Sequence, residues 1–280
     1  GTPQWEKASQ YCDSIINSGV YTLENDVSAP FVTNNQNSSE IIFSIPYDED
    51  NFQGFRLHMR TLHYQHNLKY NMPVGPWNGF AVVPTFFDTY SENDVRKDAY
   101  HIYGPQLTPG GDTIIDKQTE EALIIDPYLP KLHMTSSEFS IYEIRTTGAR
   151  IGKYEIKMGA KENLSNDLPL FRLTDIYLMK AEAEIRQGNS GDQWVDPIRE
   201  RAGVPDIENV TLEELLAERG RELYAEGHRR QDLIRFGEFT KQWWAKGDAQ
   251  GGVTGDPSVT TFPIPKWATD ANPNLLEEPK

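Results

Sequence analysis

Three charged stretches in the last third of the chain decide how its helices are arranged: Arg199–Val204 (RERAGV), Glu218–Arg229 (ERGRELYAEGHR) and Asp232–Arg235 (DLIR). Acidic and basic side chains recur in them at the spacing that places neighbours on one face of a helix. The arginines also suit an anion site, because planar guanidinium groups match carboxylates and phosphates. We interpret these stretches as an ion-pair network that fixes how one helix packs on the next.

Helix start and stop signals surround these stretches. Thr211 and Glu214 form a capping box, in which each side chain bonds the other residue's backbone N–H, so a helix is predicted to begin there. Further helices are predicted from Thr2 to Gly19, from an Asp167 cap to Gly188, and over Gln231–Lys246. Packed helices are therefore expected at both ends of the chain.

The region between the first two predicted helices has a different pattern. Residues 20–167 are interrupted by Pro, Gly and Asn clusters. Only Ile41–Ile45 is typical of a strand, and Phe86–Tyr90 is predicted as a short helix. Long loops in a folded domain are usually functional, so a binding site is expected in this region.

Composition excludes some classes of protein. The formal net charge of −15 and the pI near 4.8 argue against nucleic-acid binding and against an anionic membrane surface. Cys12 is the single cysteine, so no intrachain disulfide is possible, and its position on an apolar helix stripe predicts a buried thiol. No apolar run approaches the length of a membrane span, and no signal segment is present.

One loop segment has the composition of a sugar-binding site. Flat aromatic rings can cover the apolar face of a sugar, while amides bond its hydroxyl groups. Residues 47–90 interleave these types in loop context. The alternative for each ring is packing in the core, where most aromatic side chains lie. The candidate glycan-binding residues are Tyr47, Phe52, Tyr64, Tyr70, Trp77 and Asn78.

Catalysis and metal binding have weaker support in the sequence. His58, His63 and His66 could bind a metal, but no cysteine accompanies them and no His-Glu-x-x-His pattern occurs. Glycoside hydrolysis needs two carboxylates at a defined separation, and no recognisable catalytic motif supplies them. Phosphate-binding and dinucleotide-binding glycine motifs are also absent. We therefore expect neither an enzyme nor a bound metal or cofactor.

Further motifs make the chain similar to a known family. They follow one order along the sequence: Trp77-Asn78-Gly79, Asp94-Val95-Arg96, Leu173–Ala183 (LTDIYLMKAEA), the charged stretches, Phe262-Pro263-Ile264-Pro265 and Asn272-Pro273-Asn274-Leu275. In this order they resemble the SusD/RagB family of surface glycan-binding lipoproteins. The resemblance implies that the chain corresponds to the C-terminal portion of the family's length.

The resemblance also implies an architecture. A mostly α-helical, tetratricopeptide-like scaffold with a loop-rich insertion and short strands is expected, as one domain over residues 1–280. Residues 1–19 and 168–246 would form the helical scaffold, and residues 20–167 the loop-rich part that faces the glycan. Residues 247–280 would form an extended C-terminal segment. Within the family the charged stretches are a structural signature, which agrees with the ion-pair interpretation.

The function implied is binding without catalysis. Family members capture oligosaccharides or polysaccharides at the outer membrane of Bacteroidota and deliver them to a TonB-dependent, SusC-like transporter. Membrane attachment would come from a lipid anchor on a cysteine outside this chain. The alternatives are a peptide-binding or assembly module of the same import system, because stacked helices form concave surfaces, and a glycoside hydrolase. The sequence does not identify the glycan.

Overall fold

A computed structural model describes residues 2–132, 134–242 and 257–276 of the chain. It divides into two compact units, Gly1–Arg229 and Arg230–Lys280, which are described separately below. Of the segment 247–280 that the sequence predicts to be extended, residues 247–256 and 277–280 lie outside the described residues.

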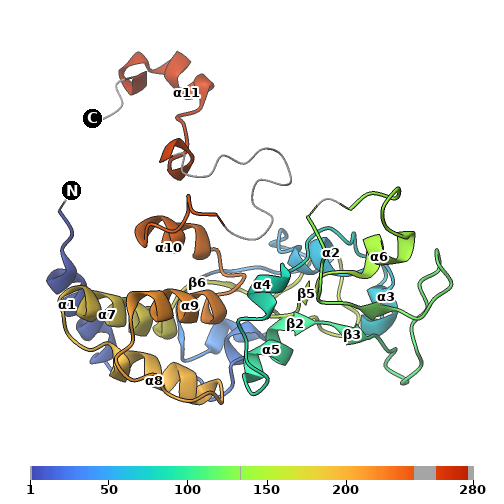
Figure 1. Cartoon of the computed structure of the whole chain (residues 1–280), viewed down its shortest axis with the longest axis horizontal. Helices are drawn as coiled ribbons and strands as arrows, with labels where there is room; N and C mark the ends of the chain where they lie inside the picture. The colour runs from blue at the N-terminus through green and yellow to red at the C-terminus, as the bar shows by residue number, and fades with distance from the viewer. Residues whose placement is uncertain (1, 133, 243–256, 277–280) are drawn as a thin grey trace. The chain divides into compact units, whose positions relative to one another are not determined.

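The first unit combines helices with two-stranded antiparallel sheets (Figure 1). Its longer helices are α1 (Trp5–Ile16), α7 (Leu173–Arg186), α8 (Asp192–Arg201) and α9 (Leu212–Glu222). Its shorter helices are α2 (Leu57–Thr61), α3 (His66–Tyr70), α4 (Pro84–Phe87), α5 (Val95–Tyr100) and α6 (Ile141–Thr146). The strand pairs are β1 (Ile41–Ile45) with β6 (Leu168–Arg172), β2 (His101–Ile102) with β5 (Arg150–Ile151), and β3 (Gly104–Pro105) with β4 (Ile124–Ile125).

The expectation of a mostly helical fold is met only in part. The long helices come from the first and last parts of this unit's sequence and lie together at one end of it, whereas the sequence between them forms short helices, short strands and irregular stretches (Figure 1). Pro and Gly interrupt regular hydrogen bonding there, so each element is brief. The strand predicted at Ile41–Ile45 is present. The helix predicted at Phe86–Tyr90 is instead α4 (Pro84–Phe87), because proline favours the first turn of a helix.

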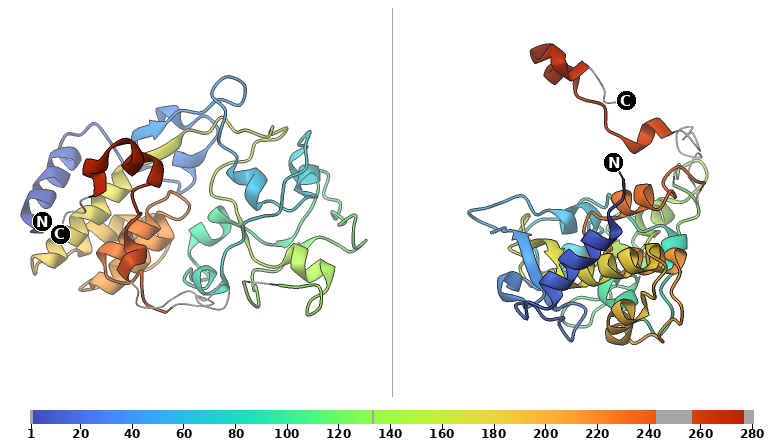
Figure 2. Two further views of the ribbon diagram at one scale, coloured as in Figure 1. Left: turned by 90° about the horizontal axis from the view of Figure 1, so that it is seen from above. Right: turned by 90° about the vertical axis from the view of Figure 1, so that its left-hand side faces the viewer.

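Helices α1 and α7 lie side by side at one end of the unit (Figures 1 and 2). Cys12 packs against Leu173 and Ile176 of α7, as the apolar stripe of α1 predicts. Burial raises the pKa of the Cys12 thiol to about 11, so the group is an inert apolar filler. The N-cap predicted at Thr2 is wrong by two residues, since Gln4 is the N-cap and α1 begins at Trp5.

The start predicted for the next long helix is also wrong. Asp167 does not cap a helix, because its carboxylate accepts hydrogen bonds from the Ser44 hydroxyl and the Tyr47 backbone N–H. Residues after it form β6, which pairs with β1. The apolar run Leu168–Phe171 fits a strand or a helix by pattern alone, and pairing with β1 selects the strand. Helix α7 then ends near Gly188, which has φ +85°, as predicted.

The capping box of α9 is confirmed. The Thr211 hydroxyl accepts a hydrogen bond from the Glu214 N–H at 3.2 Å. The Glu214 carboxylate accepts one from the Thr211 N–H at 2.8 Å. Because two unsatisfied N–H groups of the first turn are bonded, the start of α9 is fixed by local sequence.

The charged stretches form a buried ion network, as predicted. At its centre the Glu222 carboxylate bonds Arg96 at 2.9 Å, Arg172 at 3.0 Å and Arg201 at 2.7 Å. Burial alone would raise the pKa of Glu222, but these three guanidinium groups hold it well below its usual range. Glu222 therefore remains ionised in the interior.

The partners in this network come mostly from distant elements, which corrects the expected helical spacing. Glu218 bonds Arg221 of its own helix, but it also bonds Arg96 at 2.6 Å and Arg199 at 2.7 Å. Further members are Glu40, Asp94, Lys153, Arg172, Arg201 and Glu226. We call the residues named in this paragraph and the previous one the ion network. It connects α9 to α5, α8, β6 and the segment before β1.

The second unit contains α10 (Arg229–Arg235), which begins at the boundary, and α11 (Lys266–Ala271). The helix predicted over Gln231–Lys246 is shorter, because Gly237 with φ +76° follows α10. Residues 243–246 lie outside the described residues. Within this unit the Arg230 guanidinium lies 5.0 Å from the centre of the Phe239 ring and 4.2 Å from that of Phe262.

Candidate functional site

The segment Trp77–Phe80 is fixed on helix α2 by backbone hydrogen bonds. The Trp77 N–H donates to the Met59 carbonyl at 2.7 Å, and the Phe80 N–H donates to the Arg60 carbonyl at 2.7 Å. A Cβ on Gly79 would lie 2.9 Å from that same carbonyl, so only glycine permits this close approach. The segment is therefore held rigidly without the support of a regular strand.

Three aromatic side chains are exposed in this region, one in the stretch that follows α2 and two in the segment Trp77–Phe80. Trp77 is 41% exposed, Phe80 52% and Tyr64 39%. Within the described residues, Trp77 and Phe80 have no contact with another aromatic ring. Buried rings such as Phe31 instead pack edge to face with other rings in the core. We call Tyr64, Trp77 and Phe80 the aromatic surface.

Arg145 of helix α6 supports this surface from a distant part of the chain. Its guanidinium lies 4.5 Å from the centre of the Tyr64 ring. Asp116 holds the guanidinium through two hydrogen bonds of 2.6 and 2.7 Å. The Arg145 carbonyl accepts a hydrogen bond of 3.0 Å from the side-chain amide of Asn78. Tyr64 and Asn78 are therefore positioned by one residue.

The six residues predicted to bind glycan lie in three different places. Tyr64 and Asn78 both contact Arg145, and Trp77 directly precedes Asn78 in the chain. Tyr47 is half-buried and stacks on Phe55 with ring centres 5.5 Å apart. Phe52 is 68% exposed in a separate turn, where its backbone pairs with Asp48. Tyr70 is half-buried against the main core, and burial raises its pKa to about 12.

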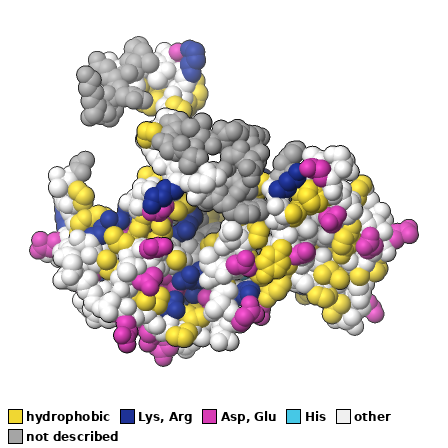
Figure 3. Space-filling view, viewed as in Figure 1, with side chains coloured by type: hydrophobic (Ala, Val, Ile, Leu, Met, Phe, Trp, Pro, Cys, Tyr) yellow, Lys and Arg dark blue, Asp and Glu magenta, His cyan; other side chains and the backbone are white. Residues whose placement is uncertain are grey.

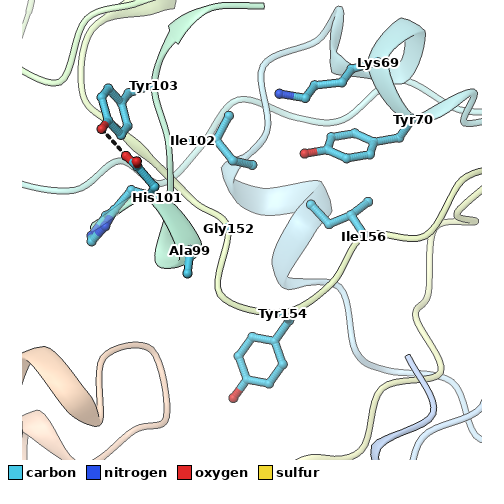
Figure 4. Close-up of a pocket in the computed structure, with 10 residues that line it drawn as sticks. Lys69, Tyr70, Ala99, His101, Ile102, Tyr103, Gly152, Tyr154 and Ile156 are labelled. Carbon is cyan, nitrogen blue, oxygen red and sulfur yellow. Dashed lines mark hydrogen bonds between the residues drawn. The ribbon is translucent and has the colours of Figure 1, made fainter. Parts of the chain in front are cut away.

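Tyr70 lines a cavity of about 400 Å³ between α3, the α5–β2 junction and the segment after β5 (Figure 4). The Lys69 ammonium donates to the Gln106 side chain at 2.8 Å, and the Tyr103 hydroxyl donates to the Asp98 carboxylate. Asp98 is the one carboxylate among the residues described as lining the cavity. Glycoside hydrolysis requires two, so this cavity does not have the composition of a hydrolase site.

The three histidines considered for metal binding have separate roles. The His58 Nε2–H donates to the Lys161 carbonyl at 2.8 Å. His66 Nδ1 accepts from the His63 N–H at 2.9 Å, and His63 Nε2 lies 3.5 Å from Asp116. In the described ranges, no three His, Cys, Asp or Glu side chains are grouped to hold a metal ion.

Sequence reasoning missed Phe80 and Arg145. Phe80 directly follows the Trp77-Asn78-Gly79 motif. Its position in a loop next to predicted glycan-binding residues could have identified it as a further candidate. Arg145 lies far along the chain, and no local pattern connects it with Tyr64 or Asp116. Only the tertiary structure brings these residues together.

Comparisons with known proteins agree with this architecture. Residues 39–280 match the sequence model of a family described as the SusD family. The chain belongs to the SusD family. This is a family of non-catalytic binding proteins. In the part of the chain that the structure describes, no helix combines the length and apolar character needed to cross a bilayer.

Individual relatives include proteins with sugar-binding names. Starch-binding protein SusD of Bacteroides thetaiotaomicron is 42% identical over 115 residues, which are 40% of this chain and 21% of that protein. SusD-like protein P25 of Formosa agariphila is 25% identical over 293 aligned residues, covering 98% of this chain and 54% of that protein. The chain thus spans about half the length of P25.

Solved structures show the same fold. Surface glycan-binding protein A from Bacteroides thetaiotaomicron, in complex with laminarihexaose, has a TM-score of 0.72 at 24% identity. The match covers 98% of this chain and 59% of that one. The same protein from Bacteroides uniformis has a TM-score of 0.67 at 20% identity, covering 96% of this chain and 55% of that one. The chain therefore has the SusD-like fold, with helices and short strands.

Proposed function

We propose that the chain binds oligosaccharides or polysaccharides on the aromatic surface, without transforming them. The observation that carries the proposal is Trp77, an exposed ring on a segment held rigidly by α2. A ring fixed before binding loses little conformational freedom when a sugar stacks on it. Two further exposed rings belong to the aromatic surface: Tyr64, which precedes Trp77 in the sequence, and Phe80, which follows it.

The side chain of Asn78 adds a polar group to the same region. Its amide nitrogen is engaged with Arg145, whereas its Oδ1 atom is buried without a hydrogen-bond partner in the described structure. A surface ligand cannot reach a buried oxygen, so the role of Asn78 is to hold this segment on Arg145. The exposed rings of Tyr64, Trp77 and Phe80 support carbohydrate as the ligand class, because flat aromatic faces can cover the apolar side of a sugar.

Family membership supports a wider setting for this binding. We extend the proposal to capture at the outer-membrane surface and delivery to a TonB-dependent, SusC-like transporter, with attachment through a lipid anchor on a cysteine outside residues 1–280. In this arrangement α1 and the helices α7–α9 would form a tetratricopeptide-like scaffold. Residues 20–167, which contain the aromatic surface, would face the glycan.

Replacement of Trp77 tests the proposal. Trp77→Ala should weaken oligosaccharide binding about tenfold or more, because loss of one stacking ring costs on the order of 1.5 kcal/mol. Trp267→Ala, which removes a tryptophan that is 75% exposed in α11, is the matched control and should leave affinity unchanged. Calorimetry against a panel of soluble bacterial, plant and host glycans measures the affinities of both variants. Thermal unfolding is recorded for each variant.

Three results would contradict parts of the proposal. One is unchanged affinity of Trp77→Ala with a large fall in melting temperature, which would make Trp77 a packing residue. Another is binding of peptides and of no glycan in the panel, which would favour the peptide-binding alternative. Release of reducing sugar by the unmodified chain would contradict the absence of catalysis.

A further inference from the structure

An exposed arginine lies beside the central ring of the aromatic surface. The Arg60 guanidinium lies 5.8 Å from the centre of the Trp77 ring. Within the described residues no carboxylate lies at ion-pair distance from it, and its side chain has no hydrogen bond. By contrast, Arg56 on the same helix flank pairs with Glu162 at 3.2 Å. Arg60 is therefore a cation available for a ligand.

A second arginine behind this surface is buried without a compensating charge. Arg150 is 3% exposed, and its guanidinium donates to the carbonyls of Arg145, Thr147 and Gly148 at 2.8–2.9 Å. Its Nε–H has no partner in the described structure. Burial lowers the pKa of Arg150 to about 10, so the group is still charged at neutral pH. Buried charges are normally paired with an opposite charge, whereas the Arg150 guanidinium is bonded only to backbone carbonyl groups.

Shared hydrogen bonds connect Arg150 to the aromatic surface. The Arg150 guanidinium and the Asn78 amide both donate to the Arg145 carbonyl, at 2.8 and 3.0 Å. The Arg145 guanidinium also lies 4.5 Å from the centre of the Tyr64 ring. Arg145 therefore connects Arg150 to Asn78 and Tyr64.

Two arginines near the aromatic surface, Arg60 and Arg150, have no carboxylate partner in the described structure. Asp116 neutralises Arg145 through its two hydrogen bonds. Burial lowers the pKa of His63 to about 4, and that of His66 falls well below its ordinary value, so both rings are neutral at pH 7. The charges of Arg60 and Arg150 remain. This contrasts with the whole chain, which carries a formal net charge of −15, and Figure 3 shows Asp and Glu side chains spread over the face in view.

We infer that the aromatic surface binds an anionic glycan, one that carries uronate carboxylates or sulfate esters. Trp77 stacks on a sugar ring, and the Arg60 guanidinium bonds the anionic group in the fork geometry that suits both anions. Arg150 does not touch the ligand and acts as a positioning residue that raises the local positive potential. Repulsion by the rest of the acidic surface is screened beyond about 8 Å at physiological salt. This inference rests on the proposed glycan binding.

Matched charged and neutral oligosaccharides test the inference. The probes are oligogalacturonates and their methyl esters, and sulfated galactan oligosaccharides and their desulfated forms, titrated into the full chain in 0.15 M salt. Arg60→Gln should weaken binding of a charged probe at least tenfold and change its neutral counterpart by less than twofold. Lys7→Gln is the matched control, because it also removes a cation beside an exposed ring. The Lys7 ammonium lies 5.8 Å from the centre of the Tyr11 ring on α1. This variant should change the binding of neither probe.

Each outcome separates the inference from the function on which it rests. A selective loss for carboxylated or for sulfated probes supports the inference and names the anion. An equal loss for charged and neutral probes, or no effect of Arg60→Gln while Trp77→Ala abolishes binding, would overturn the inference and leave glycan binding standing. Binding of the neutral glycans without binding of the charged probes would also overturn the inference and leave glycan binding standing. If no glycan binds at all, both fail.

Discussion

Two regions of the first unit use arginine in opposite ways. In the ion network, Arg96 and Arg172 are buried and each bonds two or more carboxylates. At the aromatic surface, Arg60 and Arg150 have no carboxylate partner among the described residues. A charge that the protein itself neutralises contributes to the fold. A charge that it leaves uncompensated is available to attract a ligand.

Aromatic side chains show the same contrast. Phe31 lies in the main core and packs edge to face with Tyr100 and Tyr154, with ring centres 6.1 and 5.3 Å apart. Trp77 and Phe80 are exposed and lack such contacts in the described structure. Replacements in the two regions should therefore separate stability from binding.

The largest effect on stability is expected at the centre of the ion network. Glu222→Gln removes the charge that compensates Arg96, Arg172 and Arg201. Breaking a buried ion pair typically costs 3–5 kcal/mol, so the free energy of unfolding should fall by about that amount. Urea denaturation measures it, with Glu213→Gln as the control because Glu213 is exposed on the same helix. A fall below about 1 kcal/mol would show that Glu222 is not essential to the fold.

A smaller effect for each residue is expected from the buried histidines when the pH is lowered from 7 to 5. Burial lowers the pKa values of four histidines below the usual 6.5: His58, His63, His66 and His101. The pKa falls to about 4 for His63 and for His101. Between pH 6.5 and 4 the unfolded chain binds more protons than the folded chain, so stability present above pH 6.5 is lost as the pH falls. Each group with a pKa near 4 should contribute on the order of 2 kcal/mol of this loss.

Individual histidines can be separated by mutation. His63→Gln should flatten the dependence of the unfolding free energy on pH over this range, since one titrating group is removed. Equal stability of the unmodified chain at pH 7 and pH 5 would contradict the account of these buried rings.

The smallest effect on stability is expected at the aromatic surface. Arg60→Gln should change the free energy of unfolding by less than about 0.5 kcal/mol, because its exposed side chain has no ion pair in the described structure. The same variant is expected to lose affinity for charged glycans. A loss of stability comparable to that of Glu222→Gln would remove the distinction between the two regions.

Much of the fold could be predicted where local sequence determines local structure. The capping box at Thr211 and the stop near Gly188 depend on neighbouring residues, and both are present. The start of α7 could not be predicted in the same way. Residues 168–171 are apolar in a pattern that fits helix or strand, and the decision comes from pairing with β1, more than a hundred residues earlier.

The candidate site was less accessible to sequence reasoning. Composition identified the segment that contains Tyr64, Trp77 and Asn78, because aromatic and amide residues alternate there. It did not indicate that Tyr47 would pack on Phe55, since burial depends on tertiary packing. The ion network illustrates the same limit: Glu218, Glu222 and Glu226 were identified from the charged stretches, but their main partners lie on other elements.

The most direct test of the account is hydrogen exchange measured with and without a bound oligosaccharide, read by mass spectrometry. The ligand should slow exchange of the Trp77, Gly79 and Phe80 amides, which bond to carbonyls of α2. Amides of α9, in the ion network, should exchange at the same rate in both states. Slower exchange confined to α7–α9, with no change at residues 77–80, would contradict the assignment of the binding site.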